Sequence, residues 1–372
     1  MKLIVVTMVK NEEIFIESSI RYWFTFADQI ILFDHYSTDG TMNILQDLIA
    51  EYGERLVLFN PYLSIGIEKQ QALVTNAMTE AAFLKYKADF VIPLDADEYP
   101  CLTQGGSLRE FFCALPQNSC YMAYWIPFAP PENDRINSDT FAPLAFNRKK
   151  RTPMPEWEKT IITRECYEQY RPLLTKGNHR FRDNGKTSLP PRENLTPKLY
   201  YAHYPCRGKT HYIIKNLHGW IANYSDITWT PGTSLQYQLA SQQIVKENGA
   251  ISQDILDWYA LSSNGMTGES IEDIKNCLEI IDPKTLFPEI LIKYTPKYII
   301  NKEPIISLFE SAMRITEQYR NNCEELAKTK KTLAQTEKAL AQNEKILEGV
   351  LKSRSWKITA PLRYCTERFH RK

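Results

Sequence analysis

Short apolar runs alternate with segments of helical periodicity along the first hundred residues. The runs that are short enough to be buried strands lie at residues 3–6, 29–33, 56–59 and 90–94. Apolar positions recur at helical spacing between them, over 12–26, from an N-cap at Asp39 to Gly53, and over 67–86. Strands separated by helices of this length form right-handed βαβ units. We therefore predict an α/β domain with a mostly parallel sheet.

The fourth apolar run ends in three acidic residues within four positions, Asp95, Asp97 and Glu98. If this segment stays extended, the side chains of Asp95 and Asp97 point to the same side. Open α/β sheets bind ligands at the carboxyl ends of their strands. Two carboxylates this close repel each other unless a cation holds them, and a divalent ion would bridge them to a diphosphate. The plainer alternative is an acidic turn that caps the next helix.

Two more polar clusters follow the first two predicted strands. Asn11 and Glu12 come after the first strand, and Asp34 and Asp39 come after the second. The predicted topology brings them to the same edge of the sheet as Asp95. The first strand is not followed by Gly-x-Gly-x-x-Gly, and the sequence has no Gly-Lys-Ser/Thr, which weighs against a dinucleotide dehydrogenase and a P-loop enzyme.

The regular alternation stops after residue 100. An aromatic-rich strand is predicted at 118–128, and residues 155–162 lead into another. Helices are predicted at 235–246, 251–261 and 271–281. Leucine then recurs every seven residues, at Leu326, Leu333, Leu340 and Leu347. This spacing predicts a coiled coil that joins copies of the chain, with a single exposed amphipathic helix as the alternative.

The last 21 residues carry seven Lys or Arg and one Glu, a net charge of +6 against +1 for the whole chain. Aromatic and aliphatic residues lie between these charges. Basic residues near an anionic leaflet attract it, so residues 352–372 are predicted to attach the protein peripherally to a membrane. The alternative is a tail that folds back as a helix cap, with its charges merely solvated.

Composition narrows the choice of function. With 43% hydrophobic and 24% charged residues and a net charge of +1, the chain lacks the basic excess of a nucleic-acid-binding protein. No apolar run has the length of a membrane span, and the first strand leaves no room for a signal peptide. The eight cysteines are scattered without a Cys-x-x-Cys pair, which predicts reduced thiols in a cytoplasmic protein. The predicted divisions are a catalytic domain 1–225, a helical extension 226–310, a coiled coil 311–352 and a basic tail 353–372.

Three motifs together resemble a family 2 glycosyltransferase of the GT-A fold. They are Val-Lys-Asn-Glu at 9–12, Phe-Asp-His-Tyr-Ser-Thr-Asp-Gly-Thr at 33–41 and Leu-Asp-Ala-Asp-Glu at 94–98. The resemblance implies that Glu12 and Asp34, with Asn11 and Asp39 beside them, hold the nucleoside of a nucleotide sugar. It implies that Asp95 and Asp97 hold Mn²⁺ or Mg²⁺ on the donor diphosphate. It also places Lys69 near the donor, with a solvated helix residue as the alternative. His35 and Tyr36 depart from the Asp-Gly that relatives often carry, which leaves base recognition open.

The block His-Tyr-Pro-Cys-Arg at 203–207 resembles a later motif of the same family. The resemblance implies that His203 binds the metal or the diphosphate, whereas a lone histidine at a strand end is otherwise a core residue. Arg207 and Lys215 would neutralise the departing diphosphate, unless they are only solvated charges.

An inverting transfer needs a carboxylate that deprotonates the acceptor hydroxyl. The later half of the predicted catalytic domain offers Glu156, Asp134, Glu158 and Asp183 for this role. We favour Glu158, with Asp183 as the second candidate.

The closing segment at 353–363 resembles the tail of many glycosyltransferases that build bacterial surface polysaccharides. The expected function is therefore metal-dependent, inverting transfer of a sugar from a nucleoside diphosphate to a glycan or lipid-linked acceptor of the cell envelope or capsule. Two alternatives stay open. One is a nucleotidyltransferase, which usually has a Gly-rich loop after its first strand, and the other is an inactive GT-A module that acts as a scaffold through its coil.

Overall fold

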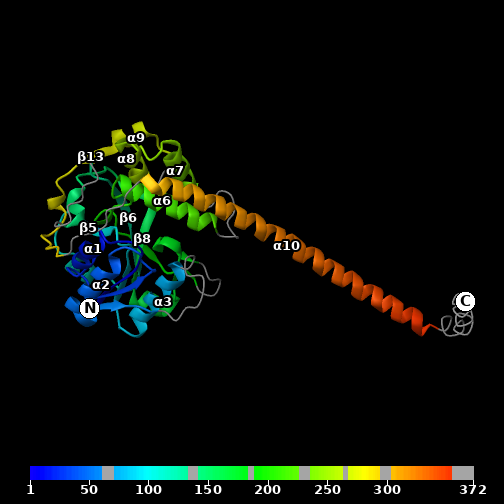
Figure 1. Ribbon diagram of the computed structural model, residues 1–372. Helices are drawn as coiled ribbons and strands as arrows, with labels where there is room; N and C mark the ends of the chain where they lie inside the picture. The colour runs from blue at the N-terminus through cyan, green and yellow to red at the C-terminus, as the bar shows by residue number, and fades with distance from the viewer. Residues whose placement is uncertain are drawn as a thin grey trace, which may run out of the picture. The chain divides into compact units, whose positions relative to one another are not determined.

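The computed structural model describes residues 1–60, 71–132, 141–182, 188–225, 235–262, 267–293 and 303–353 (Figure 1). Lys69, Asp134, Asp183 and the basic tail from 354 onward lie outside these residues. The chain forms two compact units, Met1–Leu217 with Gln236–Ile306 and His218–Leu235 with Ser307–Lys372. The boundaries expected from the sequence at 225, 310 and 352 remain predictions.

The first unit is built on one large mixed sheet. Its eleven strands among the described residues are β1 (Leu3–Val9), β2 (Gln29–Asp34), β3 (Leu56–Leu58), β4 (Phe90–Pro93), β5 (Glu98–Leu102), β6 (Cys120–Ala129), β7 (Arg148–Lys150), β8 (Met154–Thr163), β11 (Arg192–Asn194), β12 (Leu199–His203) and β13 (Leu278–Ile280). A small antiparallel pair, β9 (Leu173–Leu174) and β10 (Phe181–Arg182), lies apart from it.

The strands predicted from the first hundred residues form the parallel part of this sheet. Its order is β3-β2-β1-β4, with every neighbouring pair parallel. β8 continues the sheet antiparallel to β4, and β6 lies antiparallel to β8. β12 runs parallel to β6 and antiparallel to β5. The structure therefore confirms the predicted α/β class, with a parallel core that is followed by helices, and the later strands add antiparallel pairs to this core.

Ten α-helices accompany the sheet among the described residues. They are α1 (Ile16–Trp23), α2 (Thr41–Tyr52), α3 (Gln71–Leu84), α4 (Leu108–Cys113), α5 (Arg164–Tyr170), α6 (Lys209–Tyr224), α7 (Leu235–Lys246), α8 (Gln253–Leu261), α9 (Ile271–Cys277) and α10 (Glu303–Lys352).

Helices cover both faces of the parallel strands, and the alternation of side chains along β1 shows why the strand is apolar throughout. Leu3 and Val5 pack in the core layer that contains α1 and α2. Ile4 and Val6 point the other way and pack against α3. All four side chains are fully buried. A continuous apolar run is the pattern expected of a strand that is covered on both faces.

Two expected helix boundaries were wrong. The helix predicted over 271–281 ends at Cys277, because residues 278–280 form strand β13 and pair with β7. Glu279 of this strand also forms an ion pair with Lys149 at 2.7 Å. Helix α2 begins one residue later than expected, with Gly40 at the N-cap. The Asp39 carboxylate instead accepts the backbone N–H of Thr41 at 3.0 Å.

A segment from late in the chain completes the core of the first unit. The ring of Phe287 lies 5.4 Å from that of Tyr22 and 5.3 Å from that of Phe141, measured between centroids. The backbone N–H of Lys293 donates to Glu17 Oε1 at 2.8 Å. Residues 283–293 therefore belong to the same packed body as the first strands.

The second unit consists of the end of α6 and most of α10. Within it, Arg320 donates to the carbonyl of Tyr224 at 2.8 Å. The helix predicted around the leucine repeat is present, and Leu326, Leu333, Leu340 and Leu347 are each between 55% and 59% exposed. None of the helices that the structure describes is both long and apolar enough to cross a membrane.

Candidate active site

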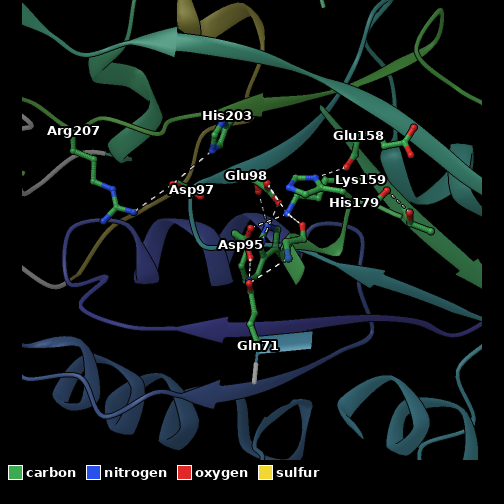
Figure 2. A network of polar contacts seen from close by, with 12 residues as sticks. Gln71, Asp95, Asp97, Glu98, Glu158, Lys159, His179, His203 and Arg207 are labelled. Atoms are coloured by element: carbon green, nitrogen blue, oxygen red, sulfur yellow. Dashed lines mark hydrogen bonds and ion pairs between the residues drawn. The ribbon is translucent and has the colours of Figure 1, made fainter. Parts of the chain in front are cut away.

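The polar clusters that follow β1, β2 and β4 come together at the carboxyl edge of the parallel strands. Val9 pairs with Asp34 in register, so β1 and β2 end level with each other. Residues that follow β12 and side chains of β8 reach the same edge, and the ion pairs below join them to it (Figure 2). Open α/β sheets bind ligands at this edge.

The loops after β1 and β2 hold each other through hydrogen bonds around Asp34. Asn11 donates its backbone N–H to Ser37 Oγ at 2.8 Å and accepts that of Thr38 through Oδ1 at 2.7 Å. Asp34 Oδ2 accepts the N–H of Ser37 at 3.0 Å. Its other oxygen, Oδ1, is buried and has no hydrogen-bond partner among the described residues. This oxygen can accept a hydrogen bond from a ligand, whereas the Asn11 side chain is already committed to the loop.

Arg207 lies between two of the predicted carboxylates. It forms an ion pair with Glu12 through Nη2, and the same nitrogen lies 3.7 Å from Asp97 Oδ2. The Arg207 side chain is only 2% exposed. The guanidinium therefore neutralises negative charge inside the site, as Figure 2 shows for Asp97.

His203, the last residue of β12, faces Asp97 from the other side. Its Nε2 lies 3.9 Å from Asp97 Oδ2, and its ring stacks on Trp125 with centroids 3.9 Å apart. Burial, reinforced by the charges of Lys215 and Lys159, lowers the pKa of His203 well below its usual value. The imidazole is therefore neutral and keeps a lone pair for a metal.

The expectation that Asp95 and Asp97 project to the same side of an extended strand is wrong. β4 ends at Pro93, and residues 96 and 97 form a turn before β5 begins at Glu98. The backbone N–H of Glu98 donates to the Asp95 carbonyl at 3.1 Å, which closes this turn. Asp97 points toward His203 and Arg207, while Asp95 points toward Gln71 and Lys159 (Figure 2).

The sequence did not single out Lys159, whose ammonium group lies beside the Asp95 carboxylate. Its Nζ lies 2.7 Å from Asp95 Oδ2 and 2.9 Å from Glu98 Oε1, and the side chain is fully buried. Burial acts to lower the pKa of Lys159, but the charges of Asp95 and Glu98 outweigh it and raise the pKa above its usual value. The available signal was a lysine embedded in a buried strand, next to Thr160 and Ile161.

Glu158, the favoured catalytic base, sits next to Lys159 on β8 but has different partners. Its Oε1 accepts from Arg192 at 2.7 Å and lies 3.4 Å from Nε of Arg180. The alternative Glu156 is exposed. Glu158 is therefore paired with two guanidinium groups of the protein itself.

Lys215 lies on α6 near the same edge. Its Nζ donates to the carbonyl of Pro205 at 3.0 Å, and its charge contributes to the pKa shifts of Glu12 and His203. It is thus close enough to affect the site electrostatically, although its hydrogen bond is to the backbone.

The residues present fit a divalent cation that is shared with a substrate. The described residues contain no ready-made group of three His, Cys, Asp or Glu ligands. Asp97 and the neutral His203 do supply one oxygen and one nitrogen 3.9 Å apart. Mg²⁺ and similar ions are commonly held by one or two protein ligands, with phosphates and water completing the shell. Asp95 is less suited, because Lys159 already occupies one of its oxygens.

The half-buried Glu12 is expected to give the site a pH dependence. Burial and the nearby Asp97 raise its pKa from 4.5 to about 7, with Arg207 acting in the opposite direction. The folded chain then binds more protons than the unfolded one between these values, so this group's contribution to stability falls as pH rises from about 4.5 to about 7. The unfolding free energy of the wild type should therefore fall between pH 5 and pH 8. We expect that of Glu12→Gln to fall by about 2 kcal/mol less over the same range. Urea unfolding at the two pH values measures this, and identical pH dependence of both proteins would contradict it.

Comparisons with known proteins add the following. No protein-family model and no curated protein sequence matches this chain. Among solved structures, S. aureus TarS in complex with UDP matches 73% of this chain and 75% of its own at 12% identity, with a TM-score of 0.34. The mannosyltransferase PcManGT from Pyrobaculum calidifontis, in complex with GDP-Man and Mn²⁺, matches 74% of this chain and 78% of its own at 12% identity, with a TM-score of 0.30. Scores this low carry no argument about function, which must rest on the residues of the chain itself.

Proposed function

We propose that the chain is a glycosyltransferase of family 2 type that moves a sugar from a nucleoside diphosphate to a glycan or lipid-linked acceptor, in the cell envelope or capsule. The observation that carries this proposal is the meeting of Glu12, Asp34 and Asp97 with His203 and Arg207 at one edge of the parallel strands. In this set, Glu12 and Asp34 would provide polar groups for the nucleoside. Asp97 and His203 would provide ligands for a divalent cation, and Arg207 would provide a positive charge for the diphosphate.

The donor nucleoside would bind over the ends of β1 and β2. Asp34 Oδ1 is a buried acceptor without a donor, and a ribose hydroxyl or a base N–H would satisfy it. Glu12 lies in the loop after β1 and is oriented by its ion pair with Arg207. In this proposal Asn11 and Asp39 act mainly by fixing the two loops, and Lys69 lies outside the described residues.

Asp97 and His203 would hold the divalent cation, Mn²⁺ or Mg²⁺. Such an ion supplies positive charge to the diphosphate as it leaves. Arg207 and Lys215 contribute further positive charge from the protein itself, which stabilises the same leaving group. The buried position of Arg207 strengthens this effect, because water screens the charge less there.

The acceptor hydroxyl attacks the anomeric carbon from the side opposite the diphosphate, so the new glycosidic bond forms as the bond to the diphosphate breaks, with inversion. The hydroxyl proton passes to a carboxylate of the later half of the catalytic domain. Glu158 remains our proposed base, and Asp183 is the alternative outside the described residues.

The remainder of the chain would bring the enzyme to its acceptor. We propose that the exposed leucines of α10 pair with those of a second copy, because four leucines recur at heptad spacing along this helix. We further propose that the basic residues of 352–372 contact an anionic membrane from its cytoplasmic side. A lipid-linked acceptor would then lie within reach.

Purified protein incubated with a panel of nucleotide sugars and MnCl₂ tests the function. We expect one donor to release nucleoside diphosphate faster than the others, and faster with an acceptor. Release of pyrophosphate from a sugar phosphate and a nucleoside triphosphate would favour the nucleotidyltransferase instead. Absence of both reactions across the panel would favour the scaffold.

Asp34 gives a separate test of the nucleoside site. We expect Asp34→Ala to weaken binding of the preferred nucleoside diphosphate by about 1–3 kcal/mol, because a ligand donor would lose its partner. Calorimetry on the wild type and the variant measures this difference. Asp47→Ala, at an exposed position of α2, serves as the control with unchanged affinity. Equal affinity of Asp34→Ala and wild type would remove Asp34 from the nucleoside site.

A further inference from the structure

From the contacts around Asp95, we infer that Lys159 is a positioning residue that holds the Asp95 carboxylate and its turn in the conformation required for sugar transfer. This inference rests on the proposed function, and it assigns a role to a residue that makes no direct contact with substrate. It also gives Asp95 and Asp97 different tasks, although they lie only two residues apart.

The ammonium of Lys159 is fully committed to the protein. A lysine has three N–H donors. Three acceptors surround Nζ: Asp95 Oδ2 at 2.7 Å, Glu98 Oε1 at 2.9 Å and the carbonyl of Gly177 at 2.7 Å. Two of these contacts are hydrogen bonds and the third, to Glu98, is an ion pair, and with the side chain fully buried the ammonium group is not accessible to a ligand. Lys159 therefore acts on the site through the groups that it holds.

These contacts close into a ring around Asp95. Gln71, at the start of α3, accepts the N–H of Gly177 through Oε1 at 3.2 Å and approaches Asp95 Oδ1 through Nε2 at 3.5 Å. Gly177 has φ +78°, a conformation that favours glycine, and a Cβ there would lie 2.5 Å from the His179 ring. The backbone around Gly177 is thus shaped to bring its carbonyl to Lys159.

The same lysine also fixes the backbone of the turn. Glu98, held through Oε1 by Lys159, uses Oε2 to accept the N–H of Asp95 at 2.9 Å. Side chain and backbone of Asp95 are therefore restrained by one buried cation (Figure 2). Asp95 Oδ2 is occupied, while Oδ1 has only the long contact to Gln71. Lys159 and Glu98 together form a clamp on Asp95. This clamp consequently presents a single carboxylate oxygen of Asp95 to the sugar donor.

Paired substitutions separate positioning from simple loss of stability. Lys159→Met alone would leave two carboxylates without their cation, and such a variant can fail to fold. The double variant Glu98→Gln/Lys159→Met removes one charge of each sign and keeps similar volumes. The matched control is Lys150→Met/Glu269→Gln on β7, which removes another largely buried lysine–glutamate pair with an Nζ–Oε2 distance of 2.7 Å.

Two measurements are made on each full-length protein. The first is hydrogen–deuterium exchange of peptides that contain residues 94–98, without metal or nucleotide. The second is kcat/KM for transfer from the preferred donor. For Glu98→Gln/Lys159→Met we expect exchange about tenfold faster and kcat/KM about a hundredfold lower. For the Lys150 control we expect both values to stay within twofold of the wild type, even if the melting temperature falls.

A folded Glu98→Gln/Lys159→Met protein with wild-type exchange and wild-type kcat/KM would overturn the inference. Faster exchange with unchanged kcat/KM would also overturn it, because the clamp would then hold the turn without serving transfer. If the wild type itself transfers no sugar, the proposed function fails, and the exchange comparison still shows whether Lys159 holds the turn.

Discussion

Replacing Asp97 by asparagine is expected to lower sugar transfer by about a thousandfold while the protein remains folded. Asp97 faces the neutral His203, so it is the natural oxygen ligand for the cation. Its side-chain contacts with His203 and Arg207 are 3.9 Å and 3.7 Å long, beyond hydrogen-bonding distance. Little of the fold therefore depends on its charge.

Initial rates across a MnCl₂ titration measure this effect, with thermal unfolding as the check on folding. Asp254→Asn is the matched control, because Asp254 is an exposed carboxylate of α8 that pairs only on the surface with Lys275. We expect it to behave as the wild type. Full activity of the wild-type enzyme in excess EDTA would contradict the metal site, and full activity of Asp97→Asn would exclude Asp97 from it.

The largest effect on stability is expected for Arg207→Met, about 3 kcal/mol of unfolding free energy. This substitution leaves Glu12 and Asp97 in a mostly buried position without their cation. Removing one partner of a buried pair costs more than removing both, because the remaining charge stays poorly solvated. The double variant Glu12→Gln/Arg207→Met is therefore expected to recover most of the loss.

Urea unfolding at pH 7.5 of the wild type, both single variants and the double variant gives the coupling between the two residues. Strictly additive effects would show that Arg207 is not held in place by Glu12. A loss below about 0.5 kcal/mol for Arg207→Met would show that water screens the site as it does an ordinary surface pair.

The parallel part of the fold was readable from the sequence because its determinants are local. Buried strands such as β1 and β4 are continuous apolar runs, and the helices between them repeat at their own period. Once these elements alternate, the topology itself places Glu12 and Asp34 at one edge. His203 ends β12 and Arg207 follows it, and both lie near Asp97 at this edge, while their roles toward a substrate remain predictions.

What the sequence did not show depends on contacts between distant segments. The turn at 95–97 replaces an extended strand because Glu98 and Lys159 bond to Asp95, and Lys159 lies 64 residues further on. Residues 278–280 form strand β13 rather than the end of a helix because they pair with β7, which lies about 130 residues earlier in the sequence. Local periodicity carries no information about such partners.

The packing of Phe287 has a practical consequence for the production of the protein in shorter pieces. A fragment that stops near residue 225 would leave the pocket between Tyr22 and Phe141 unfilled and the Glu17 carboxylate without the N–H of Lys293. Its first hundred residues would then expose aromatic surface that the full chain covers, which favours aggregation during expression. Truncations intended for crystallisation should therefore keep the chain through residue 293 and shorten it only beyond that point.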